Sequence, residues 1–175
     1  MQISTEAIRE LRDKTGAGIM ECKRALQDAD GNIEAAAEKL IERGYEIAKK
    51  KENRIARQGL VESYVHAGGR IGALVEINCE SDFVARTPEF KELAHDLAMQ
   101  VVATCPSYVG AEDIPEGTEF EEEDCLLLQP FIKDPGKKVQ DIIAEAVAKV
   151  RENVKIRRFI RFELGVDGQD EQSEV

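Results

Sequence analysis

The sequence contains no long apolar run and no secretory leader pattern at its start. Its longest apolar run, Cys125–Leu128, is far shorter than the about 20 residues that a membrane-spanning helix needs. The first residues, Met1–Glu6, contain neither a basic segment nor an apolar segment of the kind that a signal peptide carries. We therefore expect neither a membrane span nor a secretory signal.

Closely spaced cysteines are also missing. The four cysteines are separated by 57, 26 and 20 positions, at Cys22, Cys79, Cys105 and Cys125. Zinc sites usually take their ligands in closely spaced pairs, so this pattern disfavours a structural metal. Scattered thiols are typical of a reducing compartment, and we expect a cytoplasmic protein without a resident metal or cofactor.

The residues that catalysis or phosphate binding would need are scarce. Neither G-x-x-x-x-G-K-[ST] nor G-x-G-x-x-G occurs, so no phosphate-binding loop is visible. A nucleophilic site needs Ser or Cys beside a histidine, and the only two histidines are His66 and His95. Either histidine could meet Cys79 in space, but no motif supports this. We favour ordinary surface or boundary histidines and keep a small hydrolase as the weaker alternative.

Positive charge is in deficit, and the deficit is uneven along the chain. The 175 residues contain 24 Lys and Arg against 35 Asp and Glu, a net charge of −11, which disfavours nucleic acid as the main partner. Residues 1–57 carry a net charge of +1 and residues 58–175 one of −12, which predicts two regions with different surfaces.

Eight carboxylates between Glu112 and Asp124 predict an exposed loop over 107–125. The polar, acidic tail at 166–175 is expected to be disordered.

Three short helices are predicted in the first region. Ser4 is a suitable N-cap, Thr15–Gly18 interrupts the helical pattern, and Asp30–Asn32 interrupts it again. The third helix is expected to end at Gly44, a residue type common after helix ends. The basic stretch Lys49–Arg54 is then a linker or a helical extension.

The second region changes to strand periodicity. The β-forming run Leu60–His66, the turn Ala67–Arg70 and the alternating run Ile71–Cys79 predict a hairpin. Thr87–Glu89 has the N-cap, the proline and the acid of a helix start, and that helix must stop near Pro106.

A further helix and a last strand complete the second region. Asp134–Pro135 is expected to open the helix, and Val154–Leu164 alternates as a strand. The sequence therefore predicts an α+β protein, with a three-helix domain at 1–52 and a core at 53–165. That core is a two-layer unit with a three-stranded antiparallel sheet, whose edge strands need a partner or protection.

Few residues of this second region suggest chemistry by themselves. Glu80 and Asp82 would share a face if the strand continued, but one such pair is commonly a solvated strand end. Phe83 could pack on the core or project as an anchor for a partner, and the local sequence favours the core. Arg157 and Arg161 could mark a nucleic-acid strand, but the acidic surroundings favour pairing with Glu or Asp.

Three segments together carry a family resemblance. Leu11–Leu26 resembles the opening of bacterial translation elongation factor Ts. Asn78–Ala85 is similar to the family's Thr-Asp-Phe-Val signature, with Ser81 in place of the threonine. Glu152–Phe159 resembles its Gly-Glu-Asn-(x)₃-Arg-Arg segment. The three occur in family order and span nearly the whole chain.

The resemblance implies specific partner contacts. The N-terminal domain would resemble a ubiquitin-associated (UBA) fold and dock on the GTPase domain of elongation factor Tu, with four residues at positions near that contact: Arg12, Ile19, Met20 and Lys23. The signature segment would reach toward the Mg²⁺ site of Tu, with Phe83 in an apolar pocket, and it comprises Ser81, Asp82, Phe83 and Val84.

The resemblance also implies a function. A family member binds Tu·GDP and speeds GDP release so that GTP can enter, which makes it a guanine-nucleotide exchange factor and not an enzyme that makes or breaks bonds. The chain is shorter than the long family members, and in short members two chains pair. We therefore expect a homodimer in a two-plus-two complex with Tu. A helical adaptor for some other protein is the alternative.

Overall fold

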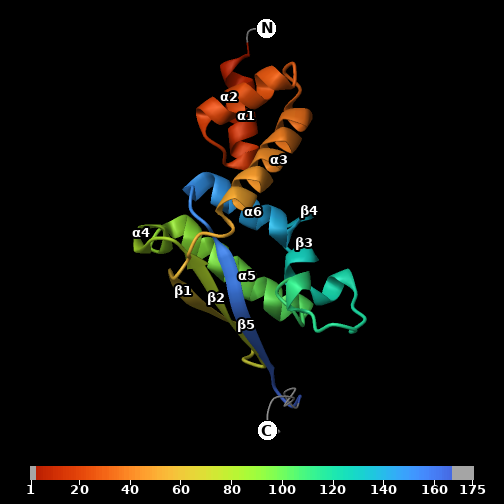
Figure 1. Ribbon diagram of the computed structural model, residues 1–175. Helices are drawn as coiled ribbons and strands as arrows, with labels where there is room; N and C mark the ends of the chain where they lie inside the picture. The colour runs from red at the N-terminus through yellow and green to blue at the C-terminus, as the bar shows by residue number, and fades with distance from the viewer. Residues whose placement is uncertain (1–2, 167–175) are drawn as a thin grey trace.

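The computed structural model describes residues 3–166, which form a helical N-terminal part and an α+β body (Figure 1). The N-terminal part consists of α1 (Thr5–Thr15), α2 (Ile19–Asp28) and α3 (Ile33–Lys51). The body contains β1 (Gln58–Val65), β2 (Ile71–Cys79), α4 (Asp82–Ala85), α5 (Pro88–Thr104), β3 (Pro130–Phe131), β4 (Asp134–Lys138), α6 (Val139–Val150) and β5 (Lys155–Glu163). The predicted α+β class is confirmed. Of the tail predicted to be disordered, 166–175, residues 167–175 lie outside the described residues.

Side-chain caps define the N-terminal helices. The Ser4 hydroxyl accepts a hydrogen bond from the Ala7 amide at 3.1 Å, as its position predicts. Asn32 caps α3 in the same way, through a 3.0 Å bond from the Ala35 amide. The helices enclose a small core of fully buried side chains: Leu11, Cys22, Ala25, Leu26 and Ala36.

Helix α3 does not end at Gly44, so that prediction was wrong. Gly44 is buried inside the helix, and a Cβ atom there would lie 3.4 Å from the carbonyl oxygen of Ala144. The glycine therefore allows α3 to pass close to α6. Beyond it, Ile47 and Ala48 pack on the core of the body. The basic stretch is thus a helical extension as far as Lys51 and anchors the N-terminal part to the body.

The body is built on an antiparallel sheet in the order β1-β2-β5. The predicted hairpin and last strand are both present. Helix α5 covers one face of the sheet (Figure 1), and its N-terminus is capped by Thr87, whose hydroxyl accepts from the Phe90 amide at 3.2 Å. The core between the two layers contains the fully buried Val75, Ile77 and Leu97.

The helix predicted from Asp134–Pro135 begins later. Asp134–Lys138 forms β4, which pairs with β3, and α6 starts at Val139. The start of α6 is fixed by Asp141, whose carboxylate accepts from the Lys138 amide at 2.7 Å. The proline therefore lies in a small hairpin and not in the first turn of a helix.

The segment 107–125, which was predicted as an exposed acidic loop and is called the acidic segment below, has little regular structure. Its two ends are held together by a bridge between Tyr108 and Cys125. Residues 111–124 between them are exposed apart from the half-buried Ile114 and Asp124, and they contain two short 3₁₀ turns at Ala111–Asp113 and Glu122–Asp124.

We predict that Gly44→Val destabilises the protein by about 1–3 kcal/mol, because the added side chain overpacks the crossing of α3 and α6. Glu46→Val, on the exposed side of the same helix, is the control for helix propensity and should cost less. Urea unfolding measures both, and a Gly44→Val protein as stable as the wild type would contradict the close approach.

Candidate functional site

The segment after β2 forms one short, doubly capped helical turn. Strand β2 ends at Cys79, and Ser81 is the N-cap of α4, with its hydroxyl 3.4 Å from the Val84 amide. At the other end the Thr87 hydroxyl donates to the Val84 carbonyl at 2.9 Å. The segment between β2 and α5 is therefore a helical turn fixed at both ends.

Phe83 projects from this turn into solvent. Its exposed fraction is 81%, so the prediction from the local sequence that Phe83 packs on the core was wrong. The reason is the helical geometry, which directs the buried Ala85 and the half-buried Val84 toward the core and leaves Phe83 on the opposite side. An exposed aromatic ring on a rigid turn has the form of an anchor for a partner.

The two acidic residues before Phe83 are not paired with each other. Asp82 lies 2.9 Å from the guanidinium of Arg86, four residues further on; Arg86 is exposed and Asp82 is half-buried. The Glu80 carboxylate instead accepts from the Asn153 backbone amide at 2.7 Å. Within residues 3–166, no group of three or more His, Cys, Asp or Glu side chains is placed to hold a metal ion.

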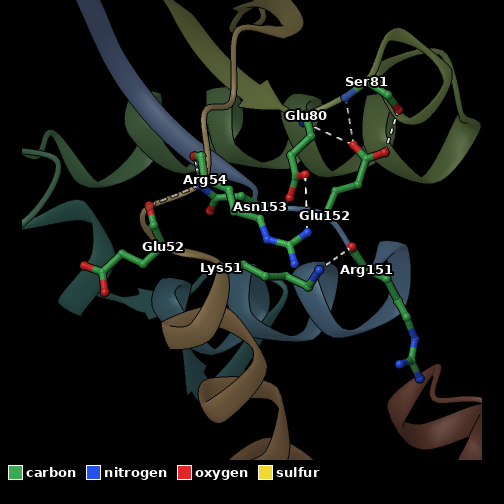
Figure 2. Close-up of polar contacts among 8 residues, drawn as sticks. All are labelled: Lys51, Glu52, Arg54, Glu80, Ser81, Arg151, Glu152 and Asn153. Carbon is green, nitrogen blue, oxygen red and sulfur yellow. Dashed lines mark hydrogen bonds and ion pairs between the residues drawn. The ribbon is translucent and has the colours of Figure 1, made fainter.

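Glu152 supports this turn (Figure 2). It is the first residue of the third resemblance segment, but it was not among the predicted site residues. Its carboxylate accepts hydrogen bonds from the Glu80 and Ser81 amides at 3.1 and 2.9 Å. It also accepts one from the Ser81 hydroxyl at 2.6 Å. Its partners lie more than 70 residues earlier in the chain, so only the fold reveals this contact.

The N-terminal residues selected by resemblance gather around the start of α2. Ile19 and Met20 are 55% and 61% exposed, which is unusual for two adjacent large apolar side chains. With Arg12 they line one shallow groove, whose other wall includes Arg151 at the end of α6. Lys23 is exposed on α2 but does not line this groove.

The arrangement gives no support to a nucleophilic site. Cys79 is buried, its thiol donates to the Ser81 carbonyl at 3.1 Å, and burial raises its pKa to about 11. His66 lies 3.1 Å from the Tyr64 hydroxyl, and His95 lies 3.5 Å from a Glu62 oxygen. The contacts of both histidines are therefore with strand β1 and not with the thiol.

The arginines of β5 pair within the chain, as predicted. Arg158 and Arg157 lie 2.8 and 3.7 Å from the two carboxylate oxygens of Glu76 on the neighbouring strand. Arg161 pairs with Glu163 at 2.8 Å.

In the part of the chain that the structure describes, no helix combines the length and the apolar character needed to cross a membrane.

Comparison with known proteins confirms the family resemblance. The family model described as elongation factor TS matches residues 2–124. The chain is 47% identical to elongation factor Ts of Carboxydothermus hydrogenoformans over 194 positions, which cover 93% of this chain and 89% of that protein. It is 44% identical to elongation factor Ts of Finegoldia magna over 212 positions, covering 99% of this chain and 94% of the relative.

These alignments also show a difference in length. An aligned region of 194 positions exceeds the 175 residues of the chain, so the relatives contain residues there that have no counterpart in this chain. The match is nevertheless extensive, because the family model covers more than half of the chain and the relatives are aligned over most of it. The chain therefore belongs to the elongation factor Ts family, whose role is guanine-nucleotide exchange on elongation factor Tu during translation elongation.

Proposed function

We propose that this protein contacts elongation factor Tu at two surfaces and releases GDP by disturbing the Mg²⁺ and phosphate site. The first surface is the turn Ser81–Val84, and the second is the start of α2. The observation that supports this proposal most is the exposure of Phe83, 81% on a turn that is capped at both ends.

The four signature residues divide into two roles in this proposal. Phe83 enters an apolar pocket of Tu, and Asp82 places negative charge and hydrogen-bond acceptors near the Mg²⁺ site. Ser81 and Val84 hold the turn, because Ser81 caps it and Val84 packs toward the core. A small displacement of its ligands is enough to weaken the binding of Mg²⁺ to Tu, since this ion demands near-ideal octahedral geometry. GDP then loses the ion that bridges its phosphate oxygens.

Docking on the GTPase domain is assigned to the N-terminal helices. Ile19 and Met20 supply exposed apolar area, and Arg12 and Lys23 supply charge around them. We propose that residues 1–52 are a UBA-like docking module and residues 53–165 the exchange and dimerisation core. The continuous helix α3, which packs in both parts, connects them.

The proposed activity needs no bond making and no resident cofactor. The protein must bind nucleotide-free Tu more tightly than Tu·GDP, and linkage then requires the protein to weaken the binding of GDP to Tu by the same factor. Such a factor works on the GTPase and not on RNA, in the cytoplasm where translation elongation takes place. A helical adaptor would bind its partner with an affinity that does not depend on GDP or Mg²⁺.

We also propose that the protein is a homodimer that forms a two-plus-two complex with Tu. The sheet face opposite α5 is apolar and exposed at Val61, Val65, Leu74, Ile160 and Phe162. Strands β1 and β5 are the two edges of this sheet. A second copy offers the same apolar face, so a two-fold pairing of the two faces would cover both.

The exchange function is tested by the release of a fluorescent GDP analogue from Tu. We expect the protein to accelerate release, and we expect Phe83→Ala to lower the second-order rate by about 30-fold or more, the loss typical of a hot-spot anchor. The unfolding free energy should change by less than about 0.5 kcal/mol, because the ring is exposed.

Phe120→Ala removes a second exposed phenylalanine, one in the acidic segment, and is the matched control. It should leave the release rate within about 2-fold of wild type. Release that is unchanged by the wild-type protein would overturn the proposed function. A loss of several kcal/mol of stability in Phe83→Ala would restore the core-packing interpretation.

The dimer is tested by sedimentation velocity at high micromolar concentration. We expect a dimer for the wild type and a monomer for Ile160→Glu, because this residue lies opposite Leu74 in the middle of the apolar face. Ile55→Glu places the same charge at an exposed position outside the sheet and should remain dimeric. A monomeric wild-type protein would contradict the proposal.

A further inference from the structure

Three consecutive residues between α6 and β5 contact segments far away in the chain (Figure 2). Arg151 ends α6 with a left-handed backbone (φ 57°), so the chain turns sharply there before Glu152 and Asn153 lead into β5. Each of the three holds a distant segment of the chain through a polar group. We call Arg151–Asn153 the junction.

Glu152 acts on the turn that presents Phe83. Its carboxylate accepts both the Glu80 and Ser81 amides, which have left the ladder of β2 at this point. The third bond, 2.6 Å from the Ser81 hydroxyl, orients the same oxygen that caps α4 at Val84. Hydrogen bonds to an ionised group are strong, and removing the acceptor would leave half-buried donors unsatisfied.

Asn153 and Arg151 act on the N-terminal part. The buried Asn153 side chain donates to the carbonyls of Glu52 and Arg54, at 3.2 and 2.8 Å, where the chain leaves α3. The Lys51 ammonium donates to the Arg151 carbonyl at 2.6 Å. The Arg151 guanidinium pairs with Glu21, the residue that follows Met20 on α2.

We propose that the junction fixes the position of the two Tu-contact surfaces relative to each other, with Glu152 as the positioning residue for Phe83. The inference rests on the proposed function of Phe83 and extends it to a residue that does not itself touch Tu. A partner engaged at two surfaces is bound best when both are already in place, since ordering them on binding costs free energy. The Glu152 carboxylate holds one surface, and its two neighbours hold the other.

A double-mutant cycle tests this assignment. We expect Glu152→Ala to lower the second-order rate of GDP release by about 10-fold in the wild-type background. In the Phe83→Ala background the same change should have less than about a 2-fold effect, because the ring that Glu152 positions is gone. Equal losses in the two backgrounds would overturn the proposal.

Conservative and matched variants separate positioning from stability. Glu152→Gln keeps an oxygen that can accept the two amides and should restore most of the rate. Asp141→Ala removes a carboxylate that likewise accepts a backbone amide and a hydroxyl, but at the other end of α6. It should lower thermal stability without slowing GDP release. A loss of rate in Asp141→Ala as large as that in Glu152→Ala would mean that general destabilisation is the cause.

Hydrogen exchange of the free protein gives a readout that does not depend on Tu. In Glu152→Ala the amides of Glu80, Ser81 and Val84 should exchange at least about 10-fold faster, with α5 unchanged. If wild type does not accelerate GDP release, the proposed function fails while this readout still reports on the turn. Unchanged exchange at the three amides would overturn the positioning role. If Glu152→Ala does not fold, Ser81→Ala replaces it in the double-mutant cycle with Phe83→Ala. Equal losses of the GDP-release rate in the two backgrounds would then overturn the proposal.

Discussion

The geometry of the turn that bears Phe83 depends on the hydrogen bonds that the Glu152 carboxylate accepts. It accepts two backbone amides and one hydroxyl where β2 ends, and the hydroxyl in turn caps the helix that bears Phe83. These donors are satisfied inside the protein, while the helical geometry of the turn leaves the aromatic ring facing solvent. A ring exposed in this way contributes little to folding, and the proposed function gives it a role in binding Tu. Sheet, junction and turn together provide a rigid base for one exposed side chain.

Much of the fold could be predicted from local sequence because local interactions determine it. Ser4 and Thr87 cap helices through hydrogen bonds to residues three positions later, and the hairpin follows from a glycine turn between alternating strands. The errors came where tertiary contacts override local preference. Gly44 resembles a helix end, but the helix continues because the position faces α6. Pro135 resembles a helix start, but it lies in a hairpin whose pairing with β3 is not visible locally.

The candidate site could be predicted only in part. Asp82 and Phe83 were selected by resemblance, whereas the local pattern alone placed Phe83 in the core, because the direction of one side chain on a four-residue helix depends on both of its caps. Glu152 was missed as a site residue. Its bonds to Ser81 span 71 residues, and no spacing rule connects a carboxylate to amides so far away. The junction with α3 and α2 likewise exists only in the folded chain.

In the proposed mechanism, the protein promotes GDP release because it prefers the nucleotide-free GTPase. Binding measured by titration calorimetry tests it directly, with Tu prepared once without nucleotide and once saturated with GDP and Mg²⁺. We expect tighter binding to nucleotide-free Tu, by the same factor by which the protein weakens the affinity of Tu for GDP. Equal affinity for the two forms of Tu would contradict it, because a protein that binds both forms equally cannot shift the equilibrium between them.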